Sequence, residues 1–256
     1  MTSQDTLHAG TRIEQRIEKQ RRRYYLKMNL RSLYACFRLG RDPYGGLRFV
    51  FMMGDSQDNI AESERRQGRI PDPYRSNASL EEMWQTGFRV PQYDIEALAK
   101  LPADTLGGAY GRHMLANNLQ ADFYDDVPPR HRMHYLRLRI RQTHDVWHVL
   151  TGLGTDEFDE VALQAFYSGQ FPNSTGAIIA VAAFLKSILR GRFDELGKHM
   201  ESFAEGYCAG KRSGSLIAVK WEELWTEKLE VLRARYSIVL PRKRQAAPVR
   251  ELRAVA

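Results

Sequence analysis

Apolar residues recur at intervals of three and four positions along most of this chain, which is the spacing of helices that bury one face. The stripe formed by Leu196, Met200, Phe203 and Tyr207 is one example. No stretch alternates apolar and polar residues as a half-buried strand does, and no segment repeats another. The pattern therefore predicts an all-α fold built as a single multi-helix domain.

Capping residues and breaks bound the predicted helices. Ser79 to Glu82 has the pattern of a capping box, and Asp94, Asp156 and Asp194 are predicted N-caps. The polar stretch 54–78 is predicted to hold only a helical turn and a loop. The helices predicted in this way cover 12–40, 47–53, 79–87, 94–101, 108–120, 130–151, a segment after Asp156, 176–190, a segment after Asp194, and 215–234.

Positive charge gathers at the two ends of the chain, whose formal net charge is +7. Residues 12–41 hold ten Lys or Arg against two Glu, a balance of +8, and residues 241–256 hold five against one, a balance of +4. We expect a disordered N-terminus (1–11), one all-α domain (12–240) and a basic C-terminal tail (241–256). Such basic ends either bind an anionic membrane surface or only keep the protein soluble. Nucleic acid is not expected as a partner, because no nucleic-acid-binding motif accompanies the charge.

The longest apolar stretch, Thr175–Leu189, is shorter than the roughly 20 residues needed to span a bilayer and contains Lys186. It is predicted to be a buried helix, with the wall of a prenyl-lipid tunnel as the alternative. The N-terminus lacks the apolar core of a secretory signal. The two cysteines, Cys36 and Cys208, are far apart, which argues against a thiolate zinc site or a disulfide scaffold.

One helical turn carries the candidate chemistry of the sequence. His144 and His148 are four residues apart and therefore lie on one face of a helix. Asp145 is adjacent to the first histidine, and Glu160 follows a break at Gly152–Gly154, where the next helix can turn back. Two imidazoles with one or two carboxylates form a ligand set for a divalent transition metal. Spacing alone leaves an alternative, in which the histidines hydrogen-bond within a core.

The same residues resemble the signature of a known family. The segment Arg139–His148, with Glu160 after it, is similar to the His-Asp-x-x-His-(x11)-Glu metal motif of the ubiquinone-biosynthesis proteins of the Coq-four family. Leu101–Gly107 and Trp221–Glu223 also resemble that family, so the similarity extends over about residues 30–240. The metal ligands that this resemblance implies are His144, Asp145, His148 and Glu160.

The sequence departs from the family pattern at two positions. Gln142 stands where family members usually carry an acid, which puts in doubt any role that needs a carboxylate there. Asp159 stands where they usually carry a glycine before the distal glutamate. Its negative charge beside the proposed metal site either tightens metal binding or alters the reactivity of the metal.

Arg141 precedes His144 by three residues, which places the two side by side on a helix. An arginine fork receives a carboxylate, phenolate or phosphate well, so Arg141 is one candidate catalytic residue and Asp145 the other. An ordinary ion pair between them is the alternative. Asp145 is either a metal ligand or a carboxylate that orients an imidazole. The other histidines of the domain are predicted to lie at the surface (His131 and His134) or to be structural (His113 and His199).

Zinc is the first choice for the metal and iron the second. Two imidazoles and carboxylates suit zinc, which polarises an oxygen without redox chemistry. Two histidines and one carboxylate with open positions are also typical of ferrous oxygenases. A zinc protease is disfavoured, because the residue after the first histidine is Asp145 rather than the glutamate that such enzymes use.

The family resemblance implies a function and a setting. The implied substrate is a polyprenylated hydroxybenzoate-type lipid, and the implied reaction is an oxidative decarboxylation that replaces the carboxylate at ring carbon 1 with a hydroxyl. The alternative is a non-catalytic scaffold that binds prenyl lipid and organises the other ubiquinone-biosynthesis enzymes at the membrane. The implied location is peripheral, on the cytoplasmic side of a bacterial membrane or on the matrix side of the mitochondrial inner membrane. The apolar stripes of the terminal helices could pack equally well in the interface of a homodimer or in the core of a single chain.

Overall fold

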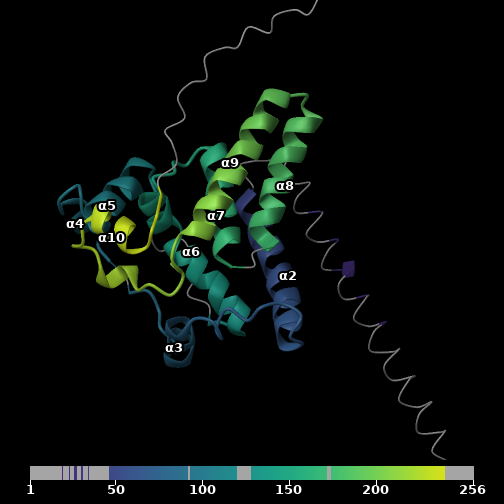
Figure 1. Ribbon diagram of the computed structural model, residues 1–256, viewed down its shortest axis with the longest axis horizontal. Coiled ribbons are helices and arrows are strands. Elements are labelled where there is room, and N and C mark those ends of the chain that lie inside the picture. Colours follow the sequence, from purple (N-terminus) through teal and green to yellow (C-terminus); the bar gives the residue numbers. More distant parts are fainter. Residues whose placement is uncertain are drawn as a thin grey trace, which may run out of the picture.

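The computed structural model describes residues 46–91, 93–119, 128–171 and 174–239, with six single positions between 19 and 34. These residues form helices joined by short loops (Figure 1). Within the described ranges the only β-type pairing is one antiparallel bridge between Thr105 and Lys228. The helices are α2 (Gly46–Arg66), α3 (Ala78–Thr86), α4 (Ile95–Ala99), α5 (Leu106–Ala116), α6 (Arg132–Thr151), α7 (Glu157–Gln170), α8 (Ser174–Leu189), α9 (Phe193–Arg212), the 3-10 turn η1 (Trp221–Glu223) and α10 (Leu229–Arg235).

The predicted all-α class and single domain are therefore confirmed for the described part of the chain. The segments 1–11 and 241–256, predicted to be a disordered N-terminus and a basic tail, lie outside the described residues. Of the predicted helix 12–40, the six described positions are all helical and exposed. Among the residues that the structure describes, no helix is both long and apolar enough to cross a membrane.

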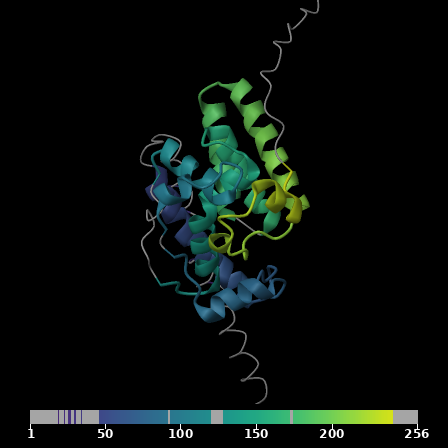
Figure 2. The same cartoon turned by 90° about the vertical axis from the view of Figure 1, so that its left-hand side faces the viewer.

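Helix α6 runs through the middle of the molecule and contacts α2, α5 and α10, while α7, α8 and α9 pack together beside it (Figures 1 and 2). The main core cluster draws its buried residues from α3 to α7 and from the segment after α9, whereas α8 packs on α7 through a small separate cluster. Trp147 of α6 is fully buried and packs its ring against Tyr167 and Phe166 of α7, at centroid distances of 4.5 and 5.7 Å. The aromatic side chains of α7 thus fix its position relative to α6.

Close backbone packing holds α7 against α9. A Cβ atom added at Gly206 of α9 would lie 2.0 Å from the carbonyl oxygen of Ala162, and one at Gly210 would lie 2.2 Å from that of Phe166. No side chain fits at these distances, so the glycines allow the two helices to touch through their main chains. Since α7 also carries Glu160, this contact fixes one wall of the site described below.

The prediction for residues 54–78 is wrong, because α2 continues to Arg66. Its inward face is polar: Gln57, Asp58 and Glu62 are buried. Asp58 accepts a hydrogen bond from Arg137 of α6, and Glu62 pairs with Arg65 at 2.8 Å. Ion pairing rather than apolar burial stabilises this face, so the hydrophobic pattern gave no sign of the helix.

The predicted helix over 215–234 is also wrong, since only η1 and α10 form there. The buried Arg139 of α6 pairs with Glu222 and donates to the carbonyl of Val219 at 2.5 Å. Gly107 donates its N–H to the carbonyl of Trp225 at 2.8 Å. Backbone groups that a helix would use internally are thus taken by α5 and α6, which holds this segment in an irregular path.

The predicted helix ends are partly right. Gly87 ends α3 in the left-handed conformation, and Asp94 and Asp156 are the N-caps of α4 and α7, as predicted. The N-cap of α3 is Asn77 instead of the predicted Ser79, and Arg192, without a side-chain cap, precedes α9. The predicted cap Asp194 lies inside α9.

Helix α8 is not the buried helix that its composition predicted. One face, with Ala180, Ala183 and Ser187, is buried against the neighbouring helices. The opposite face exposes Val181 and Leu185 to solvent. The predicted prenyl-lipid tunnel stays a prediction.

Candidate metal centre

The site lies where α6 ends and α7 begins. Gly152 ends α6 with φ +69°, in the left-handed region that glycine favours, and donates its N–H to the carbonyl of His148 at 2.8 Å. The chain turns back, and Asp156 caps α7 by accepting from the N–H groups of Phe158 and Asp159. Glu160, in the first turn of α7, is thereby brought to the histidines of α6.

Three ligand atoms converge between the two helices. The Nε2 atoms of His144 and His148 are 3.2 Å apart, and Oε2 of Glu160 lies 3.5 and 3.4 Å from them. A tetrahedral zinc with Zn–N bonds of about 2.0–2.1 Å sets its ligand atoms about 3.3 Å apart. The triangle formed by the three atoms has the size of one face of such a tetrahedron, so the side chains fit a divalent metal.

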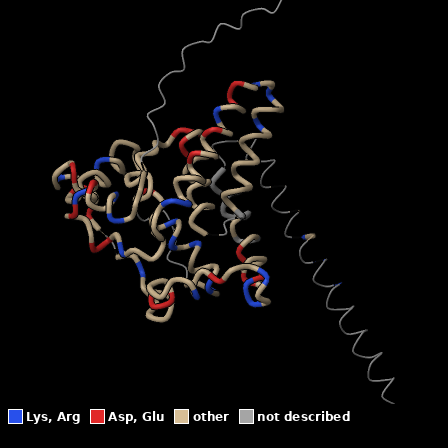
Figure 3. Tube along the Cα trace, viewed as in Figure 1, with Lys and Arg blue, Asp and Glu red and all other residues tan. Residues whose placement is uncertain are grey.

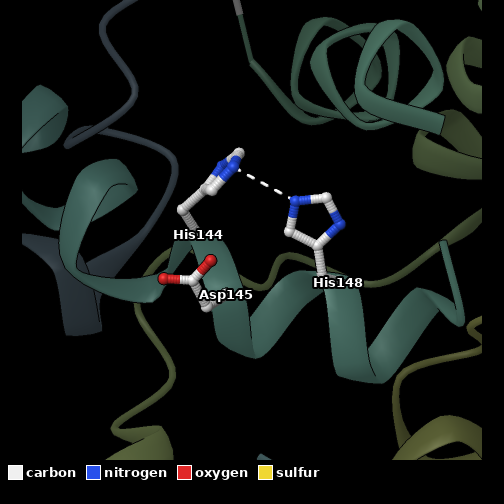
Figure 4. A group of neighbouring side chains, drawn as sticks. All are labelled: His144, Asp145 and His148. Atoms are coloured by element: carbon white, nitrogen blue, oxygen red, sulfur yellow. Dashed lines mark hydrogen bonds between the residues drawn. The ribbon is translucent and has the colours of Figure 1, made fainter. Parts of the chain in front are cut away.

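Asp145 completes a group of potential ligands but lies differently. Ligand atoms of His144, Asp145 and His148 all lie within 4.8 Å of one another. The imidazoles project from the same side of α6 and face each other, whereas Asp145 leaves the helix in another direction (Figure 4). Consecutive helical residues point about 100° apart, which explains the difference. Glu160 thus approaches the two imidazoles from α7, whereas Asp145 approaches them from α6 itself.

Each converging side chain is oriented by a second contact. The Nδ1 atom of His148 is 3.2 Å from the carbonyl oxygen of Leu153, and that of His144 is 3.2 Å from the hydroxyl of Tyr167. Gln164 donates to Oε1 of Glu160 at 2.9 Å, which leaves Oε2 for the site. An imidazole that binds metal through Nε2 carries its proton on Nδ1, and both Nδ1 atoms have an oxygen to receive that hydrogen bond.

Each ionisable group of the site favours the charged form of its neighbour. Burial raises the pKa of Glu160, but the adjacent His144 and His148 outweigh burial and bring that pKa well below its usual value. Burial likewise lowers the pKa of His144, but the charge of Glu160 outweighs it and the net shift is upward. The negative charge of Glu160 therefore favours the protonated form of His144. A divalent cation held by the same carboxylate would compete with that proton.

The structure places Arg141 toward α2. A Cβ atom added at Gly54 of α2 would lie 3.6 Å from Nη2 of Arg141 and 3.3 Å from Nη1 of Arg137. The two guanidinium groups thus approach the same point of the α2 backbone. Arg137 is buried and pairs with Asp58, whereas Arg141 is half-buried and lies one turn before His144.

Sequence reasoning missed three residues at the site. Tyr167 and Gln164 lie on the same face of α7 as Glu160, at spacings of seven and four residues, and that spacing was the available signal. His113 of α5 stacks on His148, with centroids 5.7 Å apart and planes at 23°. Burial and the neighbouring His148 lower the pKa of His113. Only the tertiary structure brings His113 here.

The predictions for the other histidines are partly corrected. His134 is buried rather than at the surface, and its Nδ1 accepts from the backbone N–H of Arg130 at 3.0 Å. His131 is half-buried and is the N-cap of α6. His199 is buried beside Ser187, with 3.2 Å between Nδ1 and Oγ, in keeping with a structural role.

Comparison with known proteins gives concordant matches. The family model for the coenzyme Q (ubiquinone) biosynthesis protein Coq4 matches residues 86–242. The mitochondrial ubiquinone biosynthesis protein COQ4 homolog of Drosophila ananassae is 31% identical over 159 residues, which are 59% of this chain and 56% of that protein. The homolog of Danio rerio is 26% identical over 197 residues, 75% of this chain and 69% of the relative. The chain thus spans little more than half the length of the first of these relatives.

A solved structure agrees in fold. The crystal structure of a candidate ubiquinone biosynthesis protein from Nostoc punctiforme superimposes with a TM-score of 0.66 at 28% sequence identity. The match covers 82% of this chain and 98% of that one. The family-model match over residues 86–242 includes both helices that form the site, α6 and α7.

Proposed function

The chain belongs to the Coq4 family, and from this premise we propose that it acts in ubiquinone biosynthesis as a metal-dependent enzyme. The proposed substrate is a polyprenylated hydroxybenzoate-type lipid, whose carboxylate at ring carbon 1 is replaced by a hydroxyl. One observation carries the proposal: Nε2 of His144, Nε2 of His148 and Oε2 of Glu160 form a triangle with sides of 3.2 to 3.5 Å.

His144, His148 and Glu160 would hold the metal, with Asp145 as the nearest further carboxylate. Zinc is the first choice and iron the second, since imidazole and carboxylate suit both. When bound, the metal would supply positive charge to a phenolic oxygen or carboxylate and so stabilise negative charge that develops on the ring.

The remaining roles fall to the protein itself. Tyr167 and the carbonyl of Leu153 fix the two imidazole rings, and Gln164 fixes the glutamate. We propose that Arg141 receives the substrate carboxylate, because a guanidinium binds a carboxylate with two hydrogen bonds. We propose that Asp145, half-buried beside His144, holds the proton that the phenol gives up.

The proposed reaction is a two-electron oxidation. The bond between the ring and its carboxyl carbon breaks and carbon dioxide leaves. The ring carbon gains an oxygen atom, and two electrons pass to an oxidant. With water as the oxygen source, the acid and one water give the phenol, carbon dioxide, two protons and two electrons. The reaction therefore needs an electron acceptor such as dioxygen as a co-substrate, and the assay has to supply it.

Replacing Glu160 with Gln tests both the site and the chemistry. The expected result is loss of bound metal, measured by elemental analysis of protein purified without chelators, and at least about a thousandfold loss of carbon dioxide release. Glu157→Gln is the matched control, because Glu157 lies one turn earlier on the same helix and is exposed. Turnover retained in Glu160→Gln, with the helical circular dichroism of the parent, would contradict the proposal.

The scaffold function is the second candidate, and the exposed apolar face of α8 favours it, because such a face suits lipid or a partner enzyme. A parent protein that binds one metal per chain but releases no carbon dioxide from any prenylated hydroxybenzoate would support it. In both cases we propose that the protein works peripherally on an anionic membrane, beside the other ubiquinone-biosynthesis enzymes. The basic ends of the chain support that setting. The relatives named above are described as mitochondrial.

A further inference from the structure

The tip of the α8–α9 hairpin exposes apolar side chains to an unusual degree. Leu189 is 73% exposed and Phe193 is 68% exposed, the two highest values among large apolar residues in the described part of the chain. They lie at the end of α8 and the start of α9, and in both views the tip projects beyond the rest of the described residues (Figures 1 and 2). We define the hairpin tip as Ile188–Phe193.

Basic residues lie between the two apolar ones. Arg190 and Arg192 are exposed and are separated by Gly191, whose φ of +65° makes the turn. Arg192 is paired with Glu195, and no ion pair is found for Arg190 among the described residues. Charged residues gather at this end of the hairpin, whereas the length of α8 is almost free of them (Figure 3). Within Ile188–Phe193 the charged residues are both arginines, and the acidic Asp194 and Glu195 follow directly in the first turn of α9.

The exposed apolar surface continues from the tip along α8. Val181, Leu185 and Ile188 are 56%, 43% and 47% exposed, and their spacing of four and three residues places them on one face of the helix. Scattered exposed apolar residues are ordinary, but a continuous ridge that ends in the most exposed tip marks an interaction surface.

We propose that the hairpin tip inserts into the interface of an anionic phospholipid membrane. Leu189 and Phe193 enter the boundary of the acyl chains, and Arg190 and Arg192 remain at the level of the phosphates and pair with them. A protein partner is less suitable, because a stable interface needs about 800 Å² of complementary surface on each side and the tip is a narrow, convex turn. A fluid bilayer adapts to that shape.

This docking brings the metal centre toward the membrane. Glu157, one turn before Glu160 on α7, accepts from Nζ of Lys186 at 2.7 and 2.8 Å and lies 3.5 Å from Nε2 of His199. Lys186 is three residues from Leu189, and His199 is six residues from Phe193. The end of α7 that carries Glu160 is therefore at the tip end of the hairpin. The anionic membrane as the setting, and the access of a lipid substrate to the metal centre, rest on the proposed function, whereas the assignment of the hairpin tip as the membrane contact does not.

Flotation of the full chain with vesicles tests the proposal without any turnover. The vesicles are phosphatidylcholine alone, or phosphatidylcholine with about one third phosphatidylglycerol. The double variant Leu189→Ser with Phe193→Ser is expected to bind anionic vesicles at least about tenfold more weakly than the parent. The matched control, Leu115→Ser with Val231→Ser, removes exposed apolar side chains of α5 and α10 and is expected to bind as the parent does.

Two further variants sharpen the test. Arg190→Gln is expected to reduce the preference for anionic over neutral vesicles. The fluorescence that Phe193→Trp adds is expected to shift to shorter wavelength when anionic vesicles are present. Brominated acyl chains in those vesicles are expected to quench it. The proposal is overturned if the serine double variant floats as the parent does. It is also overturned if that variant changes only the mass of the protein in solution, because the tip then serves contact between protein chains.

Discussion

Helix α6 carries two clusters of ionisable side chains, and they differ in how their charges are used. Toward α2, Arg137 pairs with Asp58 in a buried contact of opposite charges. Toward α7, His144 and His148 direct ring nitrogens at each other and at the carboxylate of Glu160. In the first cluster each charge meets its opposite, which stabilises the fold. In the second, three acceptor atoms converge, which suits a cation or proton between them.

The comparison teaches how to recognise a site in a polar interior. Buried ionisable residues alone do not indicate function, since ion pairs also fill interfaces between helices. The informative feature is convergence, together with second contacts that orient each ligand. Tyr167 and the carbonyl of Leu153 provide such contacts for the α7-facing cluster. The two clusters should therefore respond oppositely to substitution: the α2-facing one in stability, the α7-facing one in metal binding.

The largest expected change in stability is in the α2-facing cluster. Asp58→Asn removes the carboxylate charge that pairs with the buried Arg137, and we expect the free energy of unfolding to fall by about 3 kcal/mol. Metal content should not change. Chemical denaturation with elemental analysis measures both. Glu82→Gln is the control, because the pair of Glu82 with Lys220 is exposed at the surface, where removal costs less than about 1 kcal/mol. Loss of metal in Asp58→Asn would contradict the assignment of the α2-facing cluster to stability alone.

Removal of the carboxylate charge of Glu62 in α2 should also lower the stability of the fold, by an amount that depends on pH. Burial raises the pKa of Glu62, but hydrogen bonds from Arg65 and Arg66 outweigh burial and lower it to about 2. A carboxyl whose pKa falls on folding stabilises the protein above its ordinary pKa of 4.5, and that contribution is lost as the pH falls toward 2.

We therefore expect Glu62→Gln to lower the free energy of unfolding by about 2 kcal/mol at neutral pH. The difference from the parent should shrink below pH 4.5. Urea unfolding at a series of pH values measures it. Glu64→Gln is the control, because Glu64 lies on the same helix and its partner Arg69 is more exposed. Its unfolding free energy is expected to differ less from that of the parent, and to vary less with pH. If the difference in unfolding free energy between parent and variant stays constant as the pH falls toward 2, Glu62 is not held ionised by the fold.

The smallest expected effect is the loss of one orienting contact in the α7-facing cluster. Tyr167→Phe removes the hydroxyl beside Nδ1 of His144, and we expect metal affinity to fall about tenfold with the fold retained. Competition with a chromophoric chelator measures the affinity. Tyr135→Phe is the matched control, since it also removes a tyrosine hydroxyl, here one that donates to the carbonyl of Phe88 at 2.9 Å. Equal affinities for both variants would argue against the assignment of Tyr167.

Where the sequence failed to predict helix structure, polar contacts were the reason. Helix α2 was predicted only as far as residue 53, because its buried face beyond that point is made of Asp58 and Glu62 instead of apolar residues. The segment 215–234 has helical spacing, yet Arg139 and Gly107 take backbone carbonyls that a helix would need. Hydrophobic periodicity does not report such contacts, since they depend on partners distant in the sequence.

The sequence alone determined what depends on local spacing. Two histidines four residues apart share a helix face wherever that helix lies, and Asp156 caps the helix that begins beside it. Only the tertiary structure decided what depends on how helices pack. It brought Oε2 of Glu160 to within 3.5 Å of both histidines, set Tyr167 behind His144, and left the apolar face of α8 exposed. The physical reason is that periodicity specifies which side chains share a face, whereas the neighbour of that face is fixed by packing between distant segments.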